Sequence, residues 1–152
     1  VFYGDHLPGI YETASSDTGN SLDLHLTDYF IWSNKASSSR GNDLDDDAYS
    51  SPNFFVAQAA EHMDAKVSPY LAFLTEMHEK IAAMEPPVVN SIQGWDRIPA
   101  GQDIYLDAKG NPMSASEFDE QTKQLLADYK LIQYDITAGE NYLKDTSFMK
   151  LP

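Results

Sequence analysis

The hydrophobic residues of this chain fall first into short continuous runs and later into stripes with helical spacing. Residues 1–3 and the run "YFIWS" at 29–33 are mostly β-branched or aromatic, the types enriched in strands. We therefore predict two strands in the first 34 residues, separated by the polar loop "ETASSDTGNSLD". The second run is apolar almost throughout, so we expect it to be buried on both faces of a parallel or mixed sheet.

A first helix is predicted after the polar stretch 35–47, which we expect to form a surface loop. Ser50 or Ser51 is a suitable cap, and Pro52 fits the first turn, where a missing N–H costs no hydrogen bond. The apolar stripe predicted for this helix is Phe55, Ala59 and Met63.

The segment "SPYLAFLTEMHEKIAAM" predicts a second helix that starts with Ser68 and Pro69 and ends at Pro86-Pro87. Its apolar stripe is Tyr70, Phe73, Leu74, Met77 and Ile81. Residues at this spacing lie on one helix face, so the stripe predicts a buried side.

A turn around Lys109-Gly110 and a last helix complete the pattern. The helix should start at Ser114, because Glu117 three residues later completes a capping box, and it should close at Gly139. Strands first and helices later fit the carboxyl-terminal part of an α/β domain better than a complete one.

Charge and composition narrow the possible functions. Ten Lys and Arg residues face 24 Asp and Glu residues, giving a net charge of −14, which repels phosphate backbones and makes nucleic acid an unsuitable partner. The chain contains no cysteine, which excludes disulfides, thiolate zinc sites and cysteine nucleophiles. No apolar run approaches the ~18 residues that a membrane span needs.

Asp5 and His6 follow the first predicted strand, with Gly4 between them and the strand. In open α/β sheets, ligands bind beyond the carboxyl ends of the strands, and the glycine permits close approach of another group. A carboxylate oxygen and an imidazole nitrogen suit a divalent metal such as Mn²⁺ or Zn²⁺. A hydrogen-bonded Asp-His turn without metal explains the same residues, and the pattern alone does not separate the two.

The stretch "FYGDHLPGIY" resembles the metal-binding strand end of the alkaline phosphatase and sulfatase superfamily. Within it, the similarity is greatest to the lipoteichoic acid synthase and phosphoglycerol transferase branch. The segments "TDYFIWSN" and "LIQYDITAGENYL" resemble the following strand and the closing segment of these enzymes, so the resemblance covers nearly the whole chain. It implies an α/β fold, a mixed sheet with flanking helices.

By this resemblance, Asp5 and His6 are two ligands of one catalytic divalent cation, usually Mn²⁺ or Mg²⁺. The other ligands, an acidic residue and the nucleophilic threonine, lie upstream of the motif in the family. Residues 1–152 are therefore expected to be the carboxyl-terminal fragment of a single extracellular catalytic domain, with no nucleophile of its own. Alone, this fragment should be inactive.

The function implied is transfer of glycerol phosphate from phosphatidylglycerol to a lipoteichoic-acid-type polymer or a glycolipid. The parent protein would act on the extracytoplasmic face of the cell membrane, held there by helices upstream of this chain. Two alternatives stay open: a sulfatase or phosphoethanolamine transferase of the same superfamily, and a degenerate domain that only binds.

Four further candidates carry weaker signals. His25 occupies the region where related transferases place a substrate-contacting histidine, although an ordinary strand-edge histidine explains it as well. The acidic run 43–47 lacks the glycine and glutamate of a calcium loop, so we expect a solvated loop. His62 and His78 lack metal-binding partners at helical spacing and are expected at a surface or helix end. The stretch 93–97, "QGWDR", suits a substrate rim or a packed tryptophan.

Overall fold

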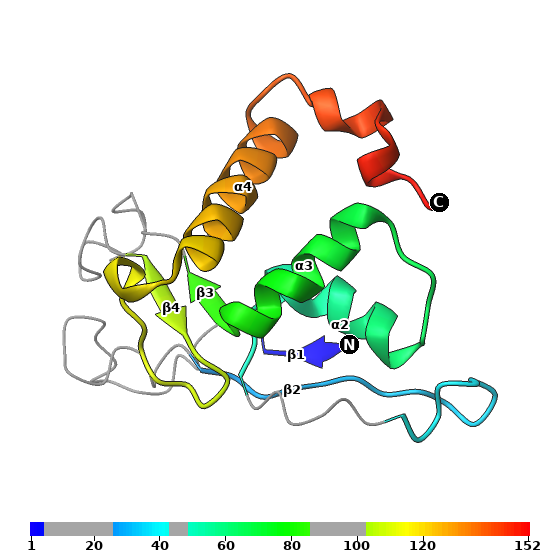
Figure 1. The fold of residues 1–152 in the computed structure, drawn as a ribbon. Coiled ribbons are helices and arrows are strands. Elements are labelled where there is room, and N and C mark those ends of the chain that lie inside the picture. The colour runs from blue at the N-terminus through cyan, green and yellow to red at the C-terminus, as the bar shows by residue number, and fades with distance from the viewer. Residues whose placement is uncertain (5–25, 43–48, 86–102) are drawn as a thin grey trace, which may run out of the picture.

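The computed structural model describes residues 1–4, 26–42, 49–85 and 103–152. Within these ranges, helices and two small antiparallel sheets alternate along the chain, which confirms the α/β class. The first sheet lies beside helix α2, and the second lies at the amino-terminal end of helix α4 (Figure 1).

Strands β1 (Phe2–Tyr3) and β2 (Tyr29–Phe30) lie at the two predicted positions and pair antiparallel. Tyr3 and Tyr29 face helix α2, where each ring centroid lies 5.0 Å from that of Phe55. Phe2 and Phe30 stack on the opposite face and are 55% and 57% exposed. The expectation of burial on both faces is therefore wrong for the part of the sheet that the structure describes.

The first helical segment consists of a 3-10 turn, η1 (Pro52–Phe54), followed by α2 (Phe55–His62). The stripe predicted for it is only partly correct, because Phe54, Phe55 and Ala57 are buried while Met63 lies beyond the helix end and is exposed. The buried residues of α2 are Phe55, Ala57, Gln58, Ala60 and His62, which do not follow the 55–59–63 spacing.

Helix α3 (Pro69–Lys80) starts as predicted, with the Ser68 hydroxyl accepting a hydrogen bond from the Leu71 N–H at 3.4 Å. Its end was predicted too late. Ile81 is extended, and the chain continues as strand β3 (Ala83–Glu85). The second sheet replaces the helical hydrogen bonds here, since Ala82 N–H donates to the Leu106 carbonyl at 2.9 Å.

Strand β4 (Ile104–Leu106) pairs antiparallel with β3 and leads into the predicted turn. Gly110 adopts a φ of +80°, a conformation that glycine favours. A Cβ atom there would also collide with the ring of Tyr49, which would have to move to make room for it.

Helix α4 (Glu120–Thr137) is capped by Asp119 and not by Ser114. The Asp119 carboxylate accepts the Thr122 N–H at 2.7 Å, a bond that lowers its pKa. Residues near Ser114 form a separate turn, η3 (Ala115–Glu117), because Phe118 is extended and packs its ring edge-on against Tyr105. That burial separates the turn from the helix.

The chain ends in two 3-10 turns, η4 (Tyr142–Asp145) and η5 (Ser147–Met149). The Asp135 carboxylate accepts the Tyr142 and Leu143 N–H groups, which ties η4 to the last turn of α4. Phe148 lies against Tyr70 of α3, with ring centroids 6.0 Å apart. The closing segment therefore bridges α4 and α3 (Figure 1).

One hydrophobic core joins these elements. Its buried members are Phe54, Ala57, Leu74, Met77, Ile81, Tyr105, Phe118 and Leu126. They come from η1, α2, α3, α4 and the second sheet, so the stripe predicted for α3 is confirmed as a core face.

We predict that Phe54→Ala lowers the free energy of unfolding by about 3–5 kcal/mol, because its ring is fully buried and its removal leaves a cavity. Urea unfolding followed by circular dichroism measures the change. The matched control is Val56→Ala two residues away, whose side chain is 62% exposed and should change stability little. Equal losses in the two variants would contradict the assigned core.

Candidate functional site

The predicted site residues Asp5, His6 and His25 lie outside the residues that the structure describes, as do the stretches 43–47 and 93–97. The structure does describe Gly4, which precedes the Asp-His pair, and the start of β2 opposite it. These residues show how the end of strand β1 is held.

Two hydrogen bonds hold Gly4 against the start of β2. Its N–H donates to the Asp28 carbonyl at 3.4 Å, and its own carbonyl accepts the Thr27 hydroxyl at 3.1 Å. A Cβ atom on Gly4 would lie 2.8 Å from the Thr27 Cβ, closer than real Cβ atoms approach a neighbour. The sequence indicated that this glycine permits close approach, and Thr27 is the group that approaches.

The donor set of Asp5 and His6 fits a divalent cation, since it offers one hard oxygen and one imidazole nitrogen. Such an ion needs further ligands. Across residues 1–4, 26–42, 49–85 and 103–152, no cluster of three metal-ligating side chains occurs.

A second polar cluster surrounds His62 at the end of α2. Its Nε2 lies 2.7 Å from the Ser33 hydroxyl, which lies 2.9 Å from that of Ser39, and the Asn42 amide donates to the His62 carbonyl. A serine beside a histidine is the pair used in nucleophilic catalysis. Here Ser39 is 2% exposed and His62 is also buried, so the cluster fixes the loop after β2 against α2.

The two helix histidines thus differ from the prediction in one respect. His62 and His78 do lie in the last turns of their helices, but neither is at the surface, and both are buried. The ring of His78 packs 5.0 Å from that of Phe54. The sequence did not indicate this burial because each histidine is next to an exposed glutamate, which marks a solvent face. Glu61 precedes His62, and Glu79 follows His78.

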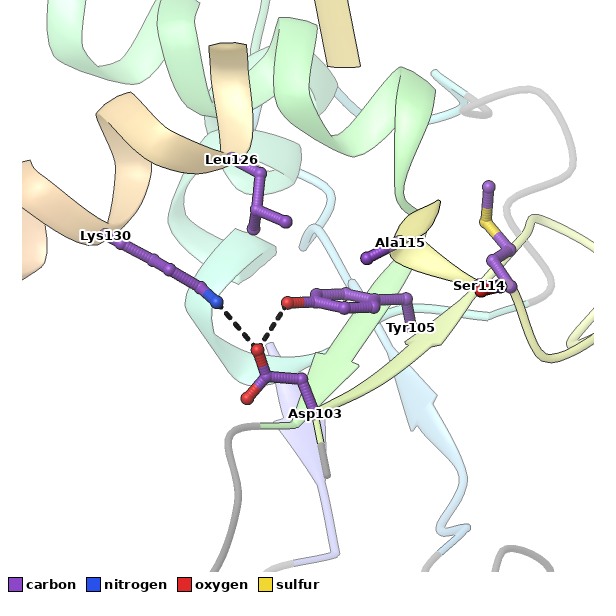
Figure 2. A pocket seen from close by; sticks show the side chains of 7 residues that line it. Asp103, Tyr105, Ser114, Ala115, Leu126 and Lys130 are labelled. Carbon is purple, nitrogen blue, oxygen red and sulfur yellow. Dashed lines mark hydrogen bonds and ion pairs between the residues drawn. The ribbon is translucent and has the colours of Figure 1, made fainter. Parts of the chain in front are cut away.

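A third constellation lies in an open cavity of about 470 Å³ between β4 and α4. Asp103 accepts hydrogen bonds from the Tyr105 hydroxyl at 2.6 Å and from the Lys130 ammonium at 2.7 Å (Figure 2). Leu126, Met113 and Ala115 form its apolar wall. The single carboxylate therefore joins strand and helix across one side of the cavity.

Electrostatics at this cavity follow from that shared carboxylate. Burial raises the pKa of Asp103, but the hydrogen bonds from Lys130 and Tyr105 and the charge of Lys130 outweigh it, so the pKa lies below 3.8. Burial and the Asp103 carboxylate raise the pKa of Tyr105. The hydrogen bond to Asp103 raises that of Lys130. The charges of the ammonium and the carboxylate neutralise one another. No pattern in the sequence predicted this pair, because its two residues are 27 positions apart.

We predict that Asp103→Asn destabilises the fold by less than about 1 kcal/mol at pH 7, because the pair is partly solvated. A lowered folded-state pKa stabilises the fold above the ordinary value of 3.8, and that contribution is lost as pH falls through the folded pKa. Urea midpoints of wild type and variant should therefore converge as the pH falls below 3.8. Glu120→Gln, which breaks the exposed pair with Lys123, is the control; equal pH dependence in both would contradict the assignment.

Comparison with known proteins gives one informative result. No protein-family model matches the chain, and no curated protein matches it. Among solved structures, it is similar to the Streptococcus pyogenes phosphoglycerol transferase GacH in complex with sn-glycerol-1-phosphate, with a TM-score of 0.61 and 32% sequence identity.

The match covers 99% of this chain and 30% of that chain, so our chain spans less than a third of the length of its relative. No helix in the described residues is long and apolar enough to cross a membrane. The fold and the identity agree with the resemblance carried by the Asp5-His6 motif. Over nearly its whole length, this chain is thus similar in fold and sequence to one part of a phosphoglycerol transferase.

Proposed function

We propose that this chain is the metal-binding part of an enzyme that transfers glycerol phosphate from phosphatidylglycerol to a glycerol-phosphate polymer or a glycolipid. The observation that carries the proposal is the match to GacH, a phosphoglycerol transferase in complex with sn-glycerol-1-phosphate, over 99% of this chain. The Asp5-His6 pair, which follows strand β1 after Gly4, supplies a carboxylate and an imidazole as metal ligands.

Asp5 and His6 would hold the cation, Mn²⁺ or Mg²⁺, through a carboxylate oxygen and an imidazole nitrogen. When bound, such an ion neutralises charge on phosphoryl oxygens and lowers the pKa of a coordinated nucleophile. Both residues must be deprotonated to act as ligands, so metal binding should weaken as pH falls below about 6.5, the ordinary pKa of histidine.

The remaining parts of this enzyme would come from outside the present chain. They include the threonine nucleophile, a further acidic ligand and the helices that hold the protein on the extracytoplasmic face of the membrane. We assign His25 to substrate contact. It lies two residues before Thr27 in the sequence, and Thr27 borders Gly4. Alone, residues 1–152 should not turn over substrate.

We predict that the full-length protein releases diacylglycerol from phosphatidylglycerol in the presence of Mn²⁺. His6→Ala should reduce the rate by more than about 100-fold, because even an outer-shell partner of a metal typically contributes 10- to 100-fold. Thin-layer chromatography of the labelled lipid measures the release. Removal of metal with a chelator and its re-addition to wild type provide the control.

Other results would point elsewhere. Release that persists in His6→Ala or in chelator would contradict the assigned metal site. Hydrolysis of a sulfate ester, or cleavage of phosphatidylethanolamine in place of phosphatidylglycerol, would favour the sulfatase or phosphoethanolamine transferase alternative. A folded, metal-loaded protein that cleaves none of these substrates would favour a degenerate binding domain.

A further inference from the structure

The hydrogen bond from Thr27 to Gly4 acts on the peptide unit that Gly4 shares with Asp5. The Thr27 hydroxyl donates to the Gly4 carbonyl oxygen at 3.1 Å. Because a peptide unit is planar, a carbonyl held in one direction also fixes the orientation of the following N–H. The bond therefore restricts the point from which the Asp5 side chain starts.

Thr27 is itself connected to the helices. It lies two residues before Tyr29, whose ring stacks on Phe55 and whose hydroxyl accepts a hydrogen bond from the buried Gln58 amide at 3.2 Å. Gly4 in turn leaves room for Thr27, since any Cβ would lie 2.8 Å from the threonine Cβ. A continuous set of contacts runs from α2 to the Gly4 carbonyl.

We propose that Thr27 is a positioning residue for the Asp5-His6 ligand pair. This inference rests on the proposed function, which assigns the metal to those two residues. Thr27 does not touch the ion in the proposal; it holds the strand end so that the two ligands start from one defined geometry. Fixing ligands in advance raises metal affinity, as outer-shell hydrogen bonds do in other metal sites.

The alternative role for Thr27 is purely structural, as a strand residue that steadies the edge of a small sheet. Melting temperature and metal affinity distinguish the two roles. Thr27 is exposed, so in a variant without the hydroxyl, water can donate to the Gly4 carbonyl and the fold keeps its stability. Thr27→Val keeps the β-branched shape and removes the donor. Thr27→Ser keeps the donor and removes the methyl group, which makes these two variants a matched pair.

The test is a titration of the metal-free full-length protein with Mn²⁺, with free Mn²⁺ followed by electron paramagnetic resonance. We expect the Kd of Thr27→Val to rise about 2- to 10-fold, the value of one net hydrogen bond. The Kd of Thr27→Ser should stay within about twofold of wild type. Melting temperatures without metal should agree for all three proteins.

A wild-type Kd shared by Thr27→Val would overturn the inference. Loss of affinity in both variants, together with a lower metal-free melting temperature, would also overturn it in favour of the structural role. His6→Ala separates these failures from failure of the proposed function: if wild type binds Mn²⁺ no better than His6→Ala, the metal assignment itself is wrong and the inference falls with it.

Discussion

The ring of Phe55 is the aromatic contact that joins both strands of the first sheet to helix α2. Tyr3 from β1 and Tyr29 from β2 both pack on it, at centroid distances of 5.0 Å. A sheet of two short strands is at best marginal in water, so its order depends on packing against a helix. In the sequence, the Asp5-His6 motif follows this sheet after Gly4.

Helix α2 can hold the sheet because its other buried side belongs to the core. Phe54 and Ala57 pack with Met77 and Ile81 of the α3 segment, and Ser51 accepts the Met84 N–H at 3.0 Å, which ties α2 to the second sheet. On its outer side the first sheet is different. Phe2 and Phe30 stack there in solvent, and Trp32, two residues after Phe30 in the sequence, is 65% exposed.

The sequence predicted those features whose causes are local. Ser68 before Pro69 capped a helix as expected, and Gly110 formed the expected turn, because capping and positive φ depend on one or two residues. The resemblance carried by the Asp5-His6 motif is also local, and the similarity to GacH agrees with it. The geometry of the motif itself lies outside the described residues and stays a prediction.

Features that depend on distant partners could not be predicted. Residues 81–85 continue the apolar pattern of α3, and only pairing with β4 makes them a strand. Ser114 and Asp119 both offer caps, and burial of Phe118 against Tyr105 decides between them. The Lys130–Asp103 pair likewise needs the fold to bring its members together.

The central claim is that Asp5 and His6 bind a catalytic divalent cation. The most direct measurement is the anomalous scattering of Mn²⁺ in crystals of the full-length protein. Our account predicts a peak about 2.0–2.2 Å from an Asp5 carboxylate oxygen and a His6 ring nitrogen, distances typical of such ligands. Well-ordered Asp5 and His6 side chains with no peak between them, in crystals saturated with Mn²⁺, would contradict it.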